Sequence, residues 1–131
     1  NTDQPYERLS LEELLSTSDV VSIHAPLNEH TERLIGAEEL QAMKSSALLI
    51  NTGRGGIVDE NELADAIDRE TIAGAALDVF ENEPIEPGNP LLSVKNKDRL
   101  VLTPHIAWAS VEARTQLIEG IKANIQEFVG G

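Results

Sequence analysis

The sequence contains no cysteine, which excludes disulfide bonds, thiolate catalysis and zinc–thiolate sites. It also lacks long apolar runs. Segments such as Ala47–Ile50 are far shorter than the stretch of about 20 residues that a membrane helix needs. Residues 1–20 are polar and acidic, so they predict no signal peptide. Together these absences fit a cytoplasmic protein.

Basic residues are scarce: 10 Lys and Arg stand against 23 Asp and Glu, for a net charge of −13. This charge repels nucleic acid and anionic lipid, so neither is an expected partner, and its simplest consequence is solubility. With 131 residues, 40% of them hydrophobic, the chain is long enough for one domain with a substantial core. Because it begins at Asn1 rather than Met, we expect a fragment of a longer protein.

Apolar segments of strand length alternate with segments of helical pattern. Ser10 and Glu13 have the spacing of a capping box, and Asp59 and Ser110 are typical helix N-caps. Continuous apolar strands alternating with helices predict an α/β fold whose parallel sheet is covered on both faces. The expected strands are Val20–Ile23, Ala47–Asn51, Ile72–Val79 and Leu100–Thr103, and the expected helices start at Ser10, at about 37 (to 44), at Asp59 and at Ser110 (to about 128).

Ligands of such sheets bind beyond the carboxyl ends of the strands, so the residues that follow each strand are informative. Ionisable residues of three chemical types follow three consecutive expected strands: Arg54, a carboxylate within the segment 78–83, and His105. We therefore expect a guanidinium, a carboxylate and an imidazole to meet at one edge of the sheet.

Four segments in this order resemble those of a known family, the D-isomer-specific 2-hydroxyacid dehydrogenases. The similarity extends from about residue 10 to residue 128. Residues 105–110 are most similar to the glycerate dehydrogenase/hydroxypyruvate reductase branch. The four segments are residues 19–27 (DVVSIHAPL), 49–59 (LINTGRGGIVD), 76–84 (ALDVFENEP) and 102–106 (LTPHI).

The resemblance implies reversible hydride transfer between NAD or NADP and a small D-2-hydroxy or 2-keto acid, with glycerate/hydroxypyruvate or glyoxylate as the expected pair. Arg54 would bind the substrate carboxylate, because a guanidinium pairs with it bidentately. His105 would transfer the proton, since imidazole titrates near neutral pH. Glu83 would hydrogen-bond His105 and favour its protonated form. Each residue also has a non-catalytic interpretation. Arg54 could be an exposed arginine in a turn, His105 a histidine bonded to backbone, and Glu83 one surface glutamate among several.

The resemblance also implies further contacts. Asp78 would lie near the nicotinamide, although it could equally cap a turn, and Trp108 could line the substrate pocket or anchor the last helix. Three scattered histidines do not have metal-site spacing, so no metal is expected. The implied cofactor contacts are His24, Ala25, Pro26, Thr52, Gly53, Arg54, Asp78, His105 and Ala107, and the implied substrate contacts are Arg54, His105 and Trp108.

Parts of the family pattern are missing. The Gly-x-Gly-x-x-Gly phosphate loop is absent, as are the segments of the substrate domain. We therefore expect residues 1–131 to be the C-terminal portion of a dinucleotide-binding domain. Strands and helices would reach about residue 108, and a terminal helix would cross to the absent domain. The fold would be a partial doubly wound, Rossmann-like sheet without its first two strands.

If the chain begins after the second strand of a 3-2-1-4-5-6 order, two missing strands leave a gap of about 14 Å between Val20–Ile23 and Ala47–Asn51. The exposed edges would then favour a swapped or intertwined oligomer, in place of the homodimer that the family implies.

We expect the chain alone to be inactive. The alternative function is that of the C-terminal-binding-protein corepressors, an NAD-binding interaction module of the same fold; a natural half-domain that serves only as an interaction piece is a third.

Overall fold

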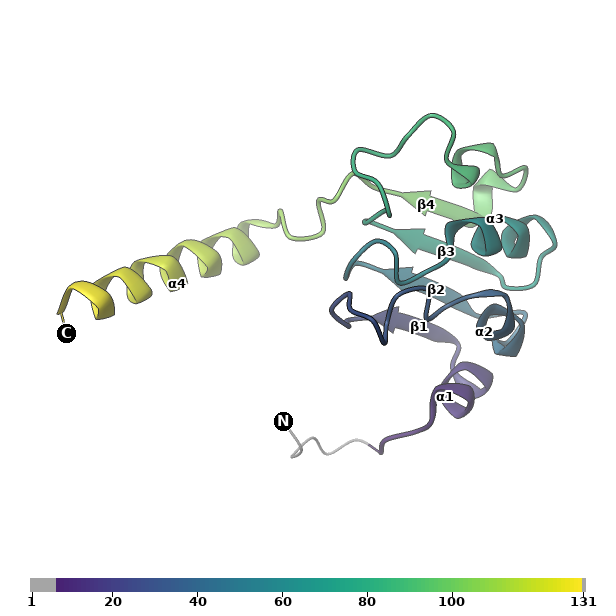
Figure 1. The fold of residues 1–131 in the computed structure, drawn as a ribbon, viewed down its shortest axis with the longest axis horizontal. Helices are drawn as coiled ribbons and strands as arrows, with labels where there is room; N and C mark the ends of the chain where they lie inside the picture. Colours follow the sequence, from purple (N-terminus) through teal and green to yellow (C-terminus); the bar gives the residue numbers. More distant parts are fainter. Residues whose placement is uncertain (1–6, 131) are drawn as a thin grey trace.

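The computed structural model describes residues 7–130; residues 1–6 and 131, which the expected domain of 1–131 includes, lie outside the described part. Four strands form one parallel sheet in the order β1-β2-β3-β4 (Figure 1). The predicted α/β fold with a parallel sheet is therefore confirmed. The strands are β1 (Val20–Ile23), β2 (Leu48–Asn51), β3 (Gly74–Leu77) and β4 (Leu100–Leu102).

Two of the predicted helix starts are set by local capping. The Ser10 hydroxyl accepts a hydrogen bond from the Glu13 amide at 3.2 Å, and the Glu13 carboxylate accepts one from the Ser10 amide at 3.0 Å. The Asp59 carboxylate accepts hydrogen bonds from the amides of Asn61 and Glu62. The helices are α1 (Leu11–Thr17), α2 (Ala37–Ala42), α3 (Glu60–Asp68), the short 3-10 helices η1 (Pro90–Ser93) and η2 (Lys97–Arg99), and α4 (Val111–Gly130).

Strands β1 and β2 are direct neighbours, with Val20 paired to Leu48 and Ile23 to Asn51. The predicted gap of two missing strands between them is therefore wrong, and the argument for a swapped oligomer that rested on it fails as well. In the 3-2-1-4-5-6 order of a doubly wound sheet, the strand order reverses between strands 1 and 4. Strands that are neighbours both in sequence and in the sheet, as here, fit the half that starts at the fourth strand. The resemblance had placed the first strand on the wrong side of that reversal.

The helices α2 and α3 lie on the same face of the sheet (Figure 1). That face holds the core, with Leu49, Leu63, Ile67 and Leu77 at most 2% exposed. On the other face Val20, Leu48 and Val101 are 43–58% exposed, so the predicted cover on both faces is wrong for residues 7–130. The reason is topological. Right-handed crossovers that all step in one direction place every connecting helix on one face.

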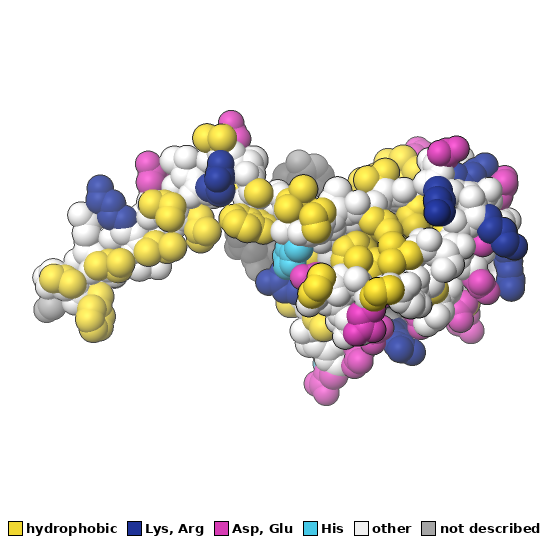
Figure 2. All heavy atoms as spheres, turned by 90° about the horizontal axis from the view of Figure 1, so that it is seen from above, with side chains coloured by type: hydrophobic (Ala, Val, Ile, Leu, Met, Phe, Trp, Pro, Cys, Tyr) yellow, Lys and Arg dark blue, Asp and Glu magenta, His cyan; other side chains and the backbone are white. Residues whose placement is uncertain are grey.

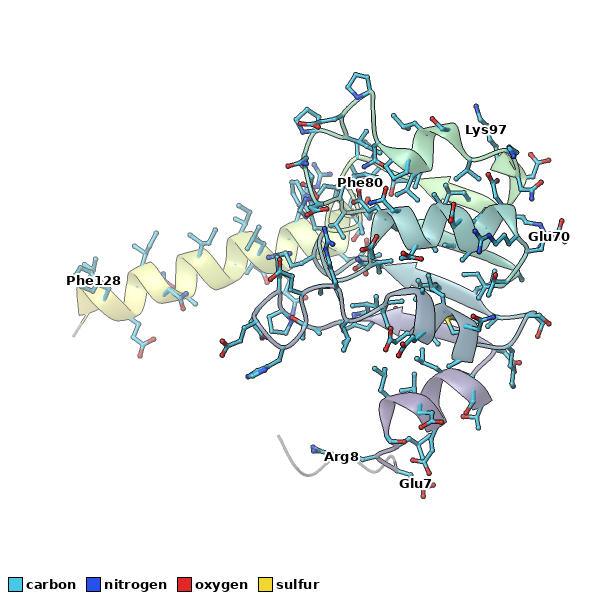
Figure 3. All side chains as sticks on the ribbon, turned by 45° about the vertical axis from the view of Figure 1, so that its right-hand side comes forward. Glu7, Arg8, Glu70, Phe80, Lys97 and Phe128 are labelled. Atoms are coloured by element: carbon cyan, nitrogen blue, oxygen red, sulfur yellow. The ribbon has the colours of Figure 1, made fainter. Side chains whose placement is uncertain are left out.

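Helix α4 extends away from the sheet, and none of its described residues is buried (Figure 1). Figure 2 shows hydrophobic side chains in a row along it, and Figure 3 shows Phe128 at its far end, where the side chain is 89% exposed. Within residues 7–130 the helix is thus amphipathic, and it does not pack extensively against any other helix or strand. No helix in this part of the chain has the length and hydropathy needed to cross a membrane.

Candidate active site

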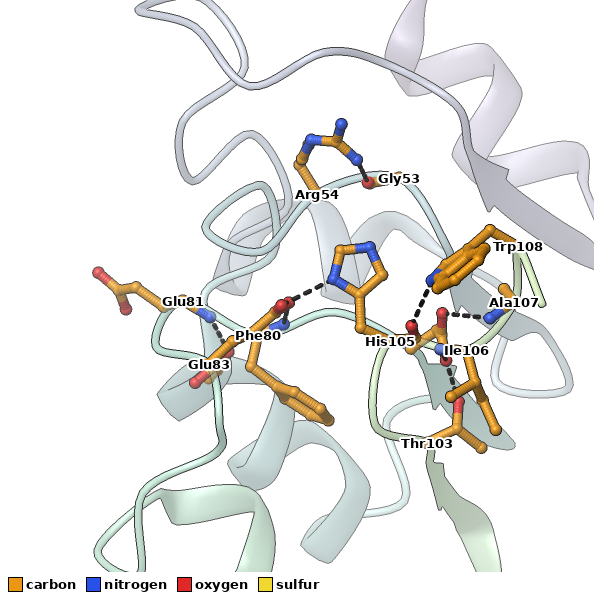
Figure 4. Close-up of polar contacts among 12 residues, drawn as sticks. Gly53, Arg54, Phe80, Glu81, Glu83, Thr103, His105, Ile106, Ala107 and Trp108 are labelled. Carbon is orange, nitrogen blue, oxygen red and sulfur yellow. Dashed lines mark hydrogen bonds and ion pairs between the residues drawn. The ribbon is translucent and has the colours of Figure 1, made fainter. Parts of the chain in front are cut away.

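The site lies at the carboxyl edge of the sheet, where the ends of the parallel strands meet. The turn after β2 carries Arg54, the loop after β3 carries Glu83, and the segment after β4 carries His105. Figure 4 shows the His105 ring directed toward the turn that carries Arg54, with Glu83 on one side of the ring and Trp108 on the other. The three residues predicted from successive strand ends are therefore neighbours in the fold.

Glu83 and His105 form a direct hydrogen bond. The Glu83 Oε2 atom lies 2.7 Å from His105 Nδ1, and Glu83 Oε1 accepts a second hydrogen bond from the Phe80 amide at 3.0 Å (Figure 4). The predicted contact between the two side chains is thus present. Because Nδ1 faces the carboxylate, Nε2 is left as the nitrogen that can exchange a proton with a ligand.

The backbone of His105 has φ +54°, a left-handed conformation that non-glycine residues seldom adopt. Asp78 holds it there. The Asp78 carboxylate is 4% exposed and accepts hydrogen bonds from the amides of Ile106 at 2.8 Å and Ala107 at 2.7 Å, and from the Thr103 hydroxyl. The strand β4 can therefore turn sharply after Pro104 and present the imidazole at the edge of the sheet. Strained backbone of this kind often marks a functional residue.

Both carboxylates are stabilised in their charged form. The hydrogen bond from His105, the Phe80 amide and the charge of His105 lower the pKa of Glu83 against the opposing effects of desolvation and of Asp78. Burial raises the pKa of Asp78, but the hydrogen bonds from Thr103, Ala107 and Ile106 outweigh it, and the pKa lies below its usual value. Both groups are therefore anionic at neutral pH, and negative charge faces the imidazole from two strand ends.

The turn that carries Arg54 is fixed by Asn51, which is 1% exposed. Asn51 donates to the Arg54 carbonyl at 2.9 Å and accepts from the Gly53 amide at 3.0 Å. The guanidinium is exposed and donates a hydrogen bond to the carbonyl of the adjacent Gly53 at 2.8 Å. The backbone is thus rigidly held while the cationic group is free to meet a ligand.

A hollow of about 680 Å³ opens between the ends of β1 and β2. Gly53 lies in it with little spare room, since an added Cβ would approach the Ile23 carbonyl oxygen to 3.2 Å. The His24 ring is exposed and hydrogen-bonds the Ser22 hydroxyl at 2.9 Å. The hollow groups most of the predicted cofactor contacts: it is lined by His24, Ala25, Pro26, Leu27, Thr52, Gly53 and Arg54.

A second hollow, of about 230 Å³, lies beside it on the bare face of the sheet. Its lining shares Thr52 with the first hollow and adds two further predicted cofactor contacts, Asp78 and Ala107. The carboxylate of Asp78, however, is already engaged by Thr103, Ile106 and Ala107. The turn-capping alternative for Asp78 is therefore realised, and a contact between Asp78 and a cofactor stays a prediction.

Trp108 stands next to the imidazole without being buried. Its indole Nε1 donates to the His105 carbonyl at 2.8 Å, and its side chain is 55% exposed. It also lines an apolar groove with the first turns of α4, including Val111 and Ile118. Both predicted roles, substrate contact and anchor of the last helix, are compatible with this position.

Asn51 and Glu60, which hold the backbone around the site, were not predicted from the sequence. Asn51 had a visible signal, because it is a polar residue that ends an apolar strand. Glu60 had none: it is 6% exposed although it stands among the acidic residues of the first turn of α3, a place where carboxylates are usually solvated. Only the tertiary fold distinguishes Glu60 from its exposed neighbour Glu62.

Comparison with known proteins matches residues 1–107 to the family described as D-isomer specific 2-hydroxyacid dehydrogenase, NAD binding domain. Glyoxylate reductase of Korarchaeum cryptofilum is 48% identical over 95% of this chain and 37% of its own length. Glycerate dehydrogenase of Methylorubrum extorquens is 46% identical over 94% of this chain and 39% of its own. The D-lactate dehydrogenase structure of Aquifex aeolicus with NAD and lactic acid superposes with a TM-score of 0.80 at 34% identity, covering 94% of this chain and 40% of that one.

A parallel sheet with its ligand-facing groups at the carboxyl edge defines a Rossmann-like nucleotide-binding unit. The chain belongs to the D-isomer-specific 2-hydroxyacid dehydrogenase family, as part of the NAD-binding domain. The resemblance drawn from the four sequence segments is therefore confirmed, and the names of the relatives also support the predicted glycerate dehydrogenase/hydroxypyruvate reductase branch. The chain spans 37–40% of the length of these three proteins.

Proposed function

We propose that this chain forms the catalytic edge of an oxidoreductase that transfers a hydride between a nicotinamide cofactor and a small D-2-hydroxy or 2-keto acid. The observation that best supports this proposal is the 2.7 Å hydrogen bond between Glu83 and His105, which follow neighbouring strands and lie beside the turn that carries Arg54. The relatives named glyoxylate reductase and hydroxypyruvate reductase support glyoxylate and hydroxypyruvate as substrates. Homo-oligomerisation and a cytoplasmic location stay predictions.

Each member of the trio has a chemical task that its surroundings support. The exposed guanidinium of Arg54 binds the substrate carboxylate and polarises the adjacent carbonyl, because its planar donors suit two oxygens at once. The His105 ring gives a proton to the carbonyl oxygen during reduction and takes it back during oxidation. The anionic Glu83 fixes the ring and stabilises the imidazolium through Nδ1.

The residues at the ends of β1 and β2 suit a dinucleotide. The hollow lined by His24, Pro26, Thr52 and Gly53 adjoins Arg54, and Gly53 leaves little spare room for a side chain. These residues and Ala25 would hold part of the cofactor, with Ala107 at its neighbouring side. The nicotinamide, when bound, supplies or accepts the hydride.

Turnover in the complete enzyme tests the assignment. With NADH or NADPH present, we expect hydroxypyruvate and glyoxylate to be reduced at rates typical of enzymes, about 1–1000 per second. Absorbance of the reduced cofactor at saturating substrate measures this directly. Cofactor binding without turnover of any small 2-keto acid would instead support the second candidate, the corepressor-like interaction module. The presence of Trp108 after His105 and Ala107 is the feature that keeps this candidate open.

Substituting Glu83 by glutamine is expected to move the pH profile of reduction to lower pH, by about one unit. The hydrogen bond to His105 lowers the pKa of Glu83, so the carboxylate and the protonated ring stabilise each other; the neutral amide removes this stabilisation, and the alkaline limb of the profile shifts accordingly. The profile of kcat/KM between pH 5 and 9 measures this shift. Glu86→Gln, the same change on another exposed glutamate of the same loop, is the matched control. An unshifted profile in the Glu83 variant would remove the role given to this residue.

A further inference from the structure

We infer that Glu60, the first residue of α3, is a positioning residue for the catalytic trio. This inference rests on the proposed function. Glu60 is 6% exposed, and both of its carboxylate oxygens are used: Oε1 accepts from the Glu81 amide at 2.8 Å and Oε2 from the Asn89 side-chain amide at 2.5 Å. A buried carboxylate is costly unless it is hydrogen-bonded, so its presence there indicates a specific task.

The two bonds bracket Glu83. Glu81 precedes it by two residues and Asn89 follows it by six, so one carboxylate fastens both ends of the loop that carries the partner of His105. The Phe80 amide, one peptide before the anchored amide of Glu81, donates to Glu83 at 3.0 Å. A shift of this loop therefore moves the Glu83 carboxylate relative to the imidazole.

The anchored peptide also supports the turn that carries Arg54. A Cβ on Gly55 would lie 1.8 Å from the Phe80 carbonyl oxygen and 2.7 Å from the Glu81 amide nitrogen, so the two backbones are in direct contact. Glu60 thus holds the peptide on which the arginine turn packs, as well as the loop of Glu83. Positional errors of about 1 Å at such sites can cost about 10²-fold in rate.

The donors and acceptors around Glu60 allow a disruptive substitution and a second one that compensates for it. Asn89 already uses its Oδ1 to accept from the Leu91 amide at 3.0 Å, which caps η1, so Asn89 has only its amino group to offer Glu60. In Glu60→Gln the new amide can accept from Glu81, but its own amino group then faces that of Asn89. In Glu60→Gln/Asn89→Asp the carboxylate moves to position 89, where it accepts from both the introduced glutamine amide and Leu91, and every hydrogen bond is restored.

We expect Glu60→Gln to lower kcat/KM of the complete enzyme by at least about tenfold. We also expect it to shift the alkaline limb of the reduction profile to lower pH, and the double variant to regain most of both. Glu62→Gln, the same charge change on an exposed residue of the same helix, should match the parent. A folded Glu60→Gln variant with the parental profile overturns the inference, as does a folded double variant that stays impaired. If the single variant does not fold, the double variant is the test: parental kcat/KM and pH profile in it support the inference, and a folded double variant that is impaired overturns it.

Solvent exchange of the His105 Nδ1 proton, followed by NMR in the complete enzyme, provides a readout that does not depend on turnover. We expect this exchange to become faster in Glu60→Gln and to slow again in the double variant, because the contact with Glu83 is loosened and then restored. If the parent reduces no 2-keto acid but the exchange still becomes faster, the proposed function fails and the positioning role stands. If the parent is active and the exchange in a folded Glu60→Gln variant does not change, the positioning role fails alone.

Discussion

Replacing His105 by asparagine is expected to lower kcat for hydroxypyruvate reduction by about 10²–10⁴-fold, the usual contribution of a positioned acid–base group. Asparagine is the suitable substitute because His105 has φ +54°, and asparagine tolerates the left-handed region better than most residues. The amide can still bond Glu83 but has no proton to exchange near neutral pH. Stopped-flow or steady-state measurement of cofactor oxidation in the complete enzyme gives the result.

The control for this variant is His30→Asn, since the His30 side chain is 85% exposed and forms its ion pair with the adjacent, equally exposed Glu29. It is expected to behave as the parent does. If His105→Asn retained the parental kcat while binding substrate normally, proton transfer would have to be assigned to another group, and the functional meaning of the Glu83–His105 pair would be lost.

Local sequence signals predicted the elements of the fold well because each depends on nearby residues. The Ser10 and Asp59 caps lie where their spacing placed them, and the four strands lie within the predicted segments. The meeting of a guanidinium, a carboxylate and an imidazole could also be predicted, since parallel strands end at one edge and the residues after them must gather there. The choice of Glu83 over the nearby Glu81 and Glu86 came from the resemblance, because Glu83 precedes Pro84 as in the family motif.

Strand order and face coverage could not be predicted in the same way. Whether Val20–Ile23 pairs with Leu48–Asn51 or with absent strands depends on the strand order of the whole sheet. Strands that are apolar on both faces carry no sequence signal for that order. The left-handed backbone of His105 is equally invisible, because the bonds from Ile106 and Ala107 to Asp78 join segments 28 and 29 residues apart. Burial of Glu60 depends on Asn89, at a separation of 29 residues.

Placing alanine at position 55 is expected to destabilise the 131-residue chain by about 3 kcal/mol, the upper end of the usual cost of overpacking. The added methyl group would lie 1.8 Å from the Phe80 carbonyl oxygen, and this atom belongs to backbone that Glu60 and Glu83 hold on either side. Neither segment can retreat as a flexible side chain would. Urea unfolding followed by circular dichroism gives the difference in unfolding free energy.

Gly88→Ala is the matched substitution, because no heavy atom lies within 4 Å of its added methyl group, and we expect its stability to differ from the parent by less than about 0.5 kcal/mol. In the complete enzyme Gly55→Ala should also lower kcat/KM with every 2-keto acid, since separating the arginine turn from the loop of Glu83 spreads the trio. Parental stability in Gly55→Ala would mean that the two backbones are not in contact. Arg54 and Glu83 would then be positioned independently of each other.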